Sequence, residues 1–62
     1  LTDQETAIKM AQEEWGIDVD SYIFETNLNS DGTYKVTVRN KTDRNAVTQY
    51  TVNVKAKTIV EE

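Results

Sequence analysis

Side chains that could carry out chemistry are few in this chain. Its 62 residues include no cysteine and no histidine, so they offer no thiolate, no disulfide and none of the commonest zinc ligands. The only serine hydroxyls belong to Ser21 and Ser30, and no histidine exists to act as their base. Ser30 also stands in a polar run that is typical of a turn, where serine forms local hydrogen bonds. The sequence therefore argues against nucleophilic catalysis.

Carboxylate pairs are the next candidates for chemistry. Glu13 and Glu14 are adjacent near the end of a predicted helix, so their side chains point to different faces. Asp18 and Asp20 are two residues apart, which would place both on one side of a strand. General acid–base catalysis also needs a sheltered cleft, which a domain of this size rarely forms. We therefore predict that the protein is not an enzyme and uses no cofactor.

The polar run Asn27–Gly32 copies the first six positions of an EF-hand calcium loop, with glycine at the sixth. An EF-hand loop begins with aspartate and ends with a bidentate glutamate at its twelfth position. This chain has Asn27 and Val38 at those two positions, and Val38 belongs to a predicted strand. With a single carboxylate, at Asp31, the run predicts a polar turn and no metal site.

A helix is predicted from about Asp3 to Trp15. Thr2-Asp3-Gln4-Glu5 matches a capping box, and Gly16 is a plausible C-cap. Four apolar residues then recur at helical spacing on one stripe: Ala7, Ile8, Ala11 and Trp15. Met10 lies outside this stripe. We expect Trp15 to anchor this helix on a sheet.

The first strand region runs from Ile17 to Leu28, and its phase depends on one choice. One alternating set of side chains is Tyr22, Phe24, Thr26 and Leu28. The other set is Val19, Ser21, Ile23 and Glu25. We take the even set as inward because it holds both aromatic residues of this region. A slip of one residue would exchange the two faces completely.

A β-hairpin is predicted at Asp31-Gly32, because glycine supplies the positive φ of a tight turn and the alternating run Thr33–Arg39 follows it. The inward residues of that second strand are Tyr34, Val36 and Val38. The polar segment from Asn40 to Asn45 predicts a longer connection to a third strand. The inward residues of the third strand are Thr48, Tyr50, Val52 and Val54. Thr58 to Val60 is either a short fourth strand or an extension of the third after a bend.

These elements indicate an α+β fold, with one N-terminal helix packed on a three- to four-stranded antiparallel meander sheet. The face of this sheet away from the helix is the candidate partner-binding face, which would also carry Asn53. Its residues are Ile23, Lys35, Thr37, Arg39, Val47, Gln49, Thr51 and Lys55. Two interpretations remain open, an ordinary solvated surface or a contact surface for a protein or a neighbouring domain. An exposed edge strand could also accept a peptide strand.

The whole chain, residues 1–62, is predicted to be one small domain, and its first residue, Leu1, favours a segment of a longer protein. Its charge is unevenly divided. Residues 1–31 carry eight acids and one base, whereas residues 32–62 carry six bases and three acids. The net charge of −4 argues against nucleic acid, although the basic sheet face could steer an acidic partner. No apolar run approaches the roughly 20 residues that cross a bilayer, so we expect no membrane insertion by this segment.

The chain resembles a PepSY domain over nearly its whole length. That family has an alanine-rich amphipathic helix, matched here by Thr2–Ala11, and a Gly-Xaa-Tyr-Xaa-Val strand, matched by Asp31–Val38. The closing segment of the family commonly reads Tyr-Xaa-Val-Asp, then Thr-Gly, then an apolar residue. Here it reads Tyr50–Asn53, then Ala56-Lys57, then Ile59, so asparagine replaces the aspartate and Ala-Lys replaces Thr-Gly.

The resemblance implies a non-enzymatic bacterial domain that lies outside the cytoplasm, in a secreted, cell-surface or lipoprotein-anchored protein. PepSY domains are associated with propeptides of secreted metallopeptidases and are thought to restrain peptidases. By this resemblance the partner would be a protein, either a peptidase or a neighbouring domain of the same chain. The alternative is a structural spacer or repeat domain of a cell-surface protein or lipoprotein, with no ligand of its own.

Overall fold

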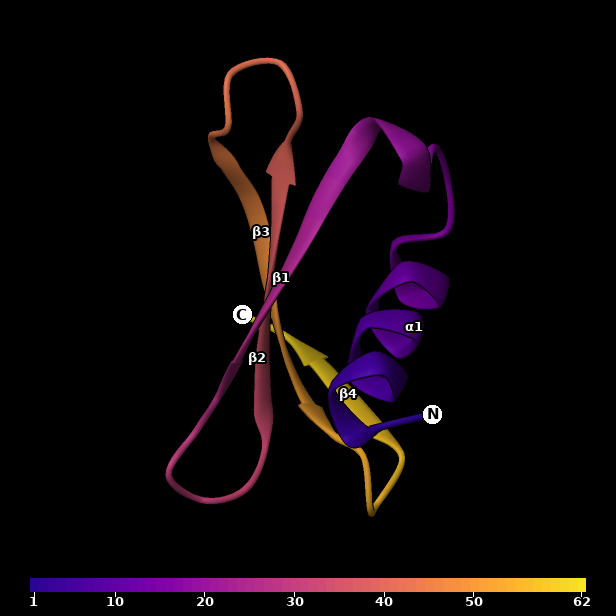
Figure 1. Cartoon of the computed structure of the whole chain (residues 1–62), viewed down its shortest axis with the longest axis vertical. Coiled ribbons are helices and arrows are strands. Elements are labelled where there is room, and N and C mark those ends of the chain that lie inside the picture. The colour runs from indigo at the N-terminus through magenta and orange to yellow at the C-terminus, as the bar shows by residue number, and fades with distance from the viewer.

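The computed structural model describes all residues from 1 to 62 and has the predicted α+β architecture (Figure 1). Its elements, in chain order, are helix α1 (Asp3–Trp15), a 3₁₀ turn η1 (Val19–Ser21) and strands β1 (Tyr22–Leu28), β2 (Tyr34–Asn40), β3 (Ala46–Asn53) and β4 (Thr58–Glu61). The strands form one antiparallel sheet in the order β1-β2-β3-β4. α1 lies across one face of this sheet. The fold class was therefore predicted correctly, and the segment after the third strand is a fourth strand.

α1 begins at the predicted capping box. The Thr2 hydroxyl accepts from the backbone N–H of Glu5 at 3.1 Å, and the Glu5 carboxylate accepts from the backbone N–H of Thr2 at 3.0 Å. The backbone N–H of Thr2 and then its hydroxyl, which donates to the same carboxylate at 3.0 Å, lower the pKa of Glu5. At the other end, Gly16 takes a φ of +90° and donates its N–H to the carbonyl of Gln12. Both predicted ends of the helix are confirmed.

A small core lies between α1 and the sheet. Its buried members are Ala7, Ala11, Val36, Val38, Tyr50 and Val52. The predicted stripe was wrong for two residues of the helix, because Met10 packs against this core whereas Ile8 is not among the residues that do. Ile8 and Met10 lie on opposite flanks of the stripe formed by Ala7 and Ala11, and the helix turns its Met10 flank to the sheet.

Trp15 anchors the end of α1 as expected. Its indole ring packs against the core and meets the ring of Tyr22 edge to face, with centroids 5.0 Å apart. The buried Nε1 of Trp15 has no hydrogen-bond partner. The anchor therefore depends on ring contacts alone.

The first strand begins later than predicted, at Tyr22, because residues 17–21 turn the chain back toward the sheet. Gly16 and Asp18 both take positive φ, +90° and +51°, and aspartate is one of the few residues that tolerate this conformation. The N–H of Ser21 then bonds to the carbonyl of Asp18 at 2.8 Å, which closes the 3₁₀ turn. Asp18 and Asp20 consequently lie in a turn, and the prediction that they share one side of a strand was wrong.

The register confirms the chosen phase of the first strand. Phe24 lies opposite Val38 and Thr26 opposite Val36, so the even residues of β1 share the face that α1 covers. Leu28 has the inward phase but remains 66% exposed, because it stands at the hairpin end of the strand. Its predicted burial was therefore wrong.

The β1–β2 hairpin turns at Asp31-Gly32, with Gly32 at a φ of +91°. The N–H of Gly32 bonds to the carbonyl of Asn29, and the N–H of Asn29 bonds to the carbonyl of Thr33. This pattern is a three-residue loop whose glycine forms a bulge, which is a longer turn than the two-residue type. The carboxylate of Asp31 accepts from both the backbone N–H and the hydroxyl of Thr33.

β3 and β4 are joined by the segment 54–57, where Lys57 takes a φ of +57°. The side-chain oxygen of Asn53 accepts from the N–H of Ala56 at 3.0 Å and so caps this turn. Val54 lies just after β3 but still packs against the core, as its predicted inward position requires.

Candidate functional site

The candidate partner-binding face is the sheet surface opposite α1. Its residues form rows across the strands, since residues directly opposite one another share a face. One row runs from Ile23 through Arg39 to Ala46 at the start of β3, where a register shift leaves Val47 as the extra residue next to it. In the next row, Thr37 lies between Glu25 and Gln49. A third row holds Lys35 and Thr51 together with Asn27.

The centre of this face is covered by neighbouring side chains. Thr37 stands at its centre and is only 5% exposed, although no helix lies above it. Its cross-strand neighbours, Glu25 and Gln49, and its strand neighbours, Lys35 and Arg39, have longer side chains that surround it. Thr37 therefore supports the face and offers little of its own surface to a partner.

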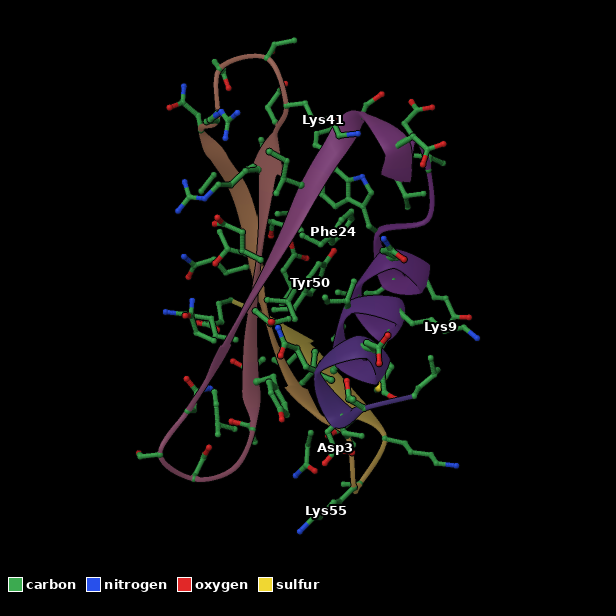
Figure 2. The ribbon with its side chains drawn as sticks, viewed as in Figure 1. Asp3, Lys9, Phe24, Lys41, Tyr50 and Lys55 are labelled. Carbon is green, nitrogen blue, oxygen red and sulfur yellow. The ribbon has the colours of Figure 1, made fainter.

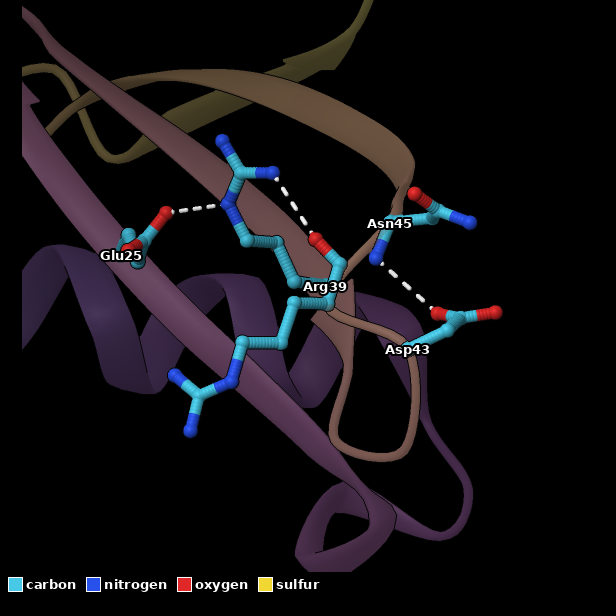
Figure 3. A network of polar contacts seen from close by, with 5 residues as sticks. Glu25, Arg39, Asp43 and Asn45 are labelled. Atoms are coloured by element: carbon cyan, nitrogen blue, oxygen red, sulfur yellow. Dashed lines mark hydrogen bonds and ion pairs between the residues drawn. The ribbon is translucent and has the colours of Figure 1, made fainter.

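Arg39 is held by two other elements (Figure 3). Its Nε donates to the carboxylate of Glu25 on β1, which is the one salt bridge of the chain. Its Nη1 donates to the backbone carbonyl of Arg44 in the β2–β3 connection at 3.1 Å. The same connection is braced by Asp43, whose carboxylate accepts from the N–H of Asn45. Arg39 thus joins β1 to the loop, and its charge is already partnered.

Lys55 does not share this face. β3 ends at Asn53, and Lys55 lies in the turn that follows, so alternation along the strand no longer decides its direction. Figure 2 shows Lys55 at the end of the molecule near Asp3, the first residue of α1, and both residues line the same depression. The face predicted from sequence therefore loses its last member.

β4 and the odd positions of β1 add residues to this face that were not predicted from the sequence. Val60 lies opposite Thr51 and is 62% exposed. Glu62 follows β4, and its carboxylate accepts from the hydroxyl of Thr51 at 2.6 Å. The alternation of Thr58–Glu61 is a signal for strand β4, but the sequence does not say which strand β4 pairs with. With Val60, three apolar side chains stand around the polar rows: Ile23, Val47 and Val60.

The other groups considered for chemistry are engaged in local structure. The hydroxyl of Thr33 and then its backbone N–H lower the pKa of Asp31, which ties this carboxylate to the hairpin turn. No group of three or more acidic, histidine or cysteine residues is placed to hold a metal ion. On the helix-covered face, burial raises the pKa of Tyr50, helped by the carboxylates of Glu61 and Glu14. Figure 2 shows Tyr50 between the sheet and α1.

Two open depressions adjoin the β3–β4 turn, and Val54 lines both of them. The larger one, of about 420 Å³, lies between the β1–β2 hairpin and the β3–β4 turn and is bordered by Asp3, Asp31 and Tyr34. The smaller, of about 380 Å³, lies between Met10 of α1 and Lys57 of the β3–β4 turn. Neither depression contains Ser21 or Ser30.

Comparison with protein-family models, with curated proteins and with solved structures found no match. The fold holds no helix that is both long enough and apolar enough to cross a bilayer.

Proposed function

We propose that this protein is a non-enzymatic interaction module that works outside the cytoplasm and modulates a peptidase, as its resemblance to PepSY domains implies. Its partner is a protein, which binds at the sheet face opposite α1. The observation that carries this proposal is the layering of the fold. α1 covers one face of the sheet, whereas the other face has no second layer of chain over it.

The composition of that face supports a protein partner. Val47 is 48% exposed and Val60 is 62% exposed, and a flat surface of this kind buries such side chains only against another macromolecule. Gln49 follows Val47 on β3, and Lys35 lies on β2 opposite Thr51. Their amide and amine groups are donors for a partner's carbonyls and carboxylates. Apolar residues with polar groups between them are the usual make-up of a protein–protein contact.

A spacer within a longer surface protein is the second candidate. It is favoured by the internal bonding of the face, since Arg39 is paired with Glu25 and Thr51 is bonded to Glu62. When the polar groups of a face are already bonded to one another, binding a partner releases less free energy than when those groups are free.

Site-specific photo-crosslinking separates these candidates. A photo-reactive amino acid is placed at Gln49 on the candidate face, and in a matched control at Lys9, which points away from the sheet (Figure 2). Secreted proteins of the source organism are then exposed to each variant. The interaction module predicts that Gln49 captures a peptidase that Lys9 does not, and that the added domain slows that peptidase in proportion to its concentration. Equal capture at both positions, with peptidase activity unchanged, would contradict the proposed function.

A further inference from the structure

The sheet has two open edges, and the longer one is β1. Ladder bonds alternate along an antiparallel strand, so every second residue points its N–H and C=O at the neighbouring strand. At the two ends of this ladder the N–H of Asn29 bonds to the carbonyl of Thr33, and the carbonyl of Ser21 accepts from the N–H of Lys41. The odd residues of β1 therefore face β2. The even residues Phe24, Thr26 and Leu28 direct their N–H and C=O groups to the open edge.

The opposite edge offers much less. The N–H of Glu62 bonds to the carbonyl of Gln49, so in the four-residue strand β4 only Ile59 and Glu61 direct backbone groups outward. Very short edge strands are one of the ways in which proteins avoid unwanted pairing. β1 has seven residues, and it is the edge on which a further strand could form several bonds.

β1 also lacks the features that normally protect an edge strand. Proteins block such edges with proline, lysine, bulges or unpaired inward charges. The chain has no proline, and the register of β1 with β2 runs without a shift from Tyr22 to Leu28. Its one charged residue is Glu25, whose carboxylate is neutralised by Arg39. This edge is therefore open to pairing.

The side chains beside the edge indicate what kind of strand it would accept. On the helix side lie Phe24, Thr26 and the 66% exposed Leu28, which favour apolar side chains at alternate positions of an added strand. The half of the chain that contains β1, residues 1–31, has a net charge of −7. Apart from Glu25, none of its carboxylates forms a salt bridge, including those of Asp18 and Asp20 just before β1. The charge therefore favours a basic partner, and it opposes a second copy that would bring its own acidic β1 to this edge.

We propose that the free edge of β1 is a strand-addition site for an extended segment of another protein, in which apolar residues alternate with lysine or arginine. The backbone N–H and C=O groups of Phe24, Thr26 and Leu28 bind the segment, and the negative net charge of residues 1–31 selects its charge. Like the surface in the proposed function, this site would bind a protein. It lies at a different place, on the edge of the sheet and not on its face.

Nuclear magnetic resonance titration with defined peptides tests this site. The probe is a short peptide of alternating lysine and valine, and its controls are the same peptide with glutamate in place of lysine and one interrupted by proline. We expect only the uninterrupted basic peptide to shift the amides of Phe24, Thr26 and Leu28 and to slow their hydrogen exchange. Shifts centred on Gln49 and Thr51 would instead assign the peptide to the sheet face, which would overturn the edge site and leave the proposed function standing.

Two variants make the test specific. Thr26→Pro removes an outward N–H but no ladder bond with β2, and proline is tolerated at such edge positions. It should weaken binding about tenfold or more, because a donor is lost and the ring blocks the edge. Leu28→Lys changes an exposed side chain, so the fold is kept while the added charge repels the basic peptide. Unchanged binding by a folded Thr26→Pro or by Leu28→Lys would overturn the site. So would dimerisation of the wild-type domain through β1 in the absence of peptide.

Discussion

The indole ring of Trp15 meets the phenol ring of Tyr22 at an angle of 69°, with the ring centroids 5.0 Å apart. This contact joins the last residue of α1 to the first residue of β1 and spans the turn at 16–21. It is the only aromatic pair of the chain, and it packs against a core whose largest fully buried side chains are three valines: Val36, Val38 and Val52. We infer that the attachment of α1 to the sheet depends strongly on this pair.

Trp15→Ala should therefore lower the free energy of unfolding by about 3 kcal/mol, because it removes the contacts that the partly buried ring makes with the core and with Tyr22. Trp15→Phe should cost less than about 1.5 kcal/mol, since it keeps a ring and removes the buried Nε1 that has no hydrogen-bond partner. Urea unfolding followed by far-ultraviolet circular dichroism measures the free energy of unfolding of both variants. The phenylalanine variant still tests the contact if the alanine variant does not fold. Equal losses for the two variants would show that the indole N–H stabilises the fold.

The sequence was sufficient to predict the helix, the hairpin and the inward phase of the strands, because these depend on local signals. The capping box fixes the start of α1, and the alternation after Gly32 fixes the phase of β2. The segment 17–21 was misassigned because its apolar alternation resembles a strand, whereas the positive φ of Asp18 turns the chain. Lys55 was misplaced on the candidate face for a similar reason, since no residue signals that β3 ends at Asn53.

The polar bonds of the candidate face could not be predicted from sequence. Glu25 and Arg39 are 14 positions apart, and their pairing depends on the register of two strands. The burial of Thr37 depends in turn on the long side chains that the register places around it. Val60 was missed because β4 could be assigned only once its pairing with β3 was known.

The hairpin glycine gives a stability prediction that depends on the backbone alone. A Cβ built at Gly32 would meet no atom within 4 Å, so Gly32→Ala creates no clash, but the φ of +91° strains any L-residue. We expect this variant to lose about 1–2 kcal/mol of stability in urea unfolding. Gly32→Asn should lose less, because asparagine tolerates left-handed conformations better than alanine. If Gly32→Ala leaves the free energy of unfolding unchanged, the loop must relax to a negative φ at this residue.

The β3–β4 turn allows the opposite experiment. Lys57 has a φ of +57°, which costs an L-residue roughly 1–2 kcal/mol, whereas glycine costs roughly 0.5–1 kcal/mol in unfolded-state entropy. Lys57→Gly should therefore raise the free energy of unfolding by about 0.5–1 kcal/mol. Lys55→Gly is the matched control in the same turn, at a residue without positive φ, and should lower it. Destabilisation by both variants would show that the Lys57 side chain contributes more than its backbone strain costs.

The Asp31 turn predicts a dependence on pH. Bonds from Thr33 hold the pKa of Asp31 in the folded protein below its ordinary value of 3.8, so the unfolded chain takes up the proton first as the pH falls. The stabilisation is fully present above that ordinary value and is lost as the pH falls through the lower folded pKa. Thr33→Val removes the hydroxyl, the largest cause of the shift, and should bring the pKa back toward its ordinary value.

Titration of the Asp31 carboxyl carbon by nuclear magnetic resonance measures this shift directly. Urea midpoints between about pH 5 and pH 2 should fall less steeply for Asp31→Asn than for the wild type, because that variant has no proton to gain at this position. Identical slopes for both proteins would mean that the turn bonds do not distinguish the folded from the unfolded carboxylate.

Arg39 should contribute to stability through two different bonds, of which one depends on salt. Its pair with Glu25 is 37% and 50% exposed, so a double-mutant cycle with Glu25→Gln and Arg39→Gln should give a coupling of about 0.2–1 kcal/mol. That coupling should shrink with added salt, since exposed charges are screened. Arg39→Gln alone should cost more than Glu25→Gln alone, because it also removes the bond to the carbonyl of Arg44 that holds the β2–β3 loop. Equal single-variant losses, measured by urea unfolding, would exclude a structural role for the loop bond and leave Arg39 with the ion pair alone.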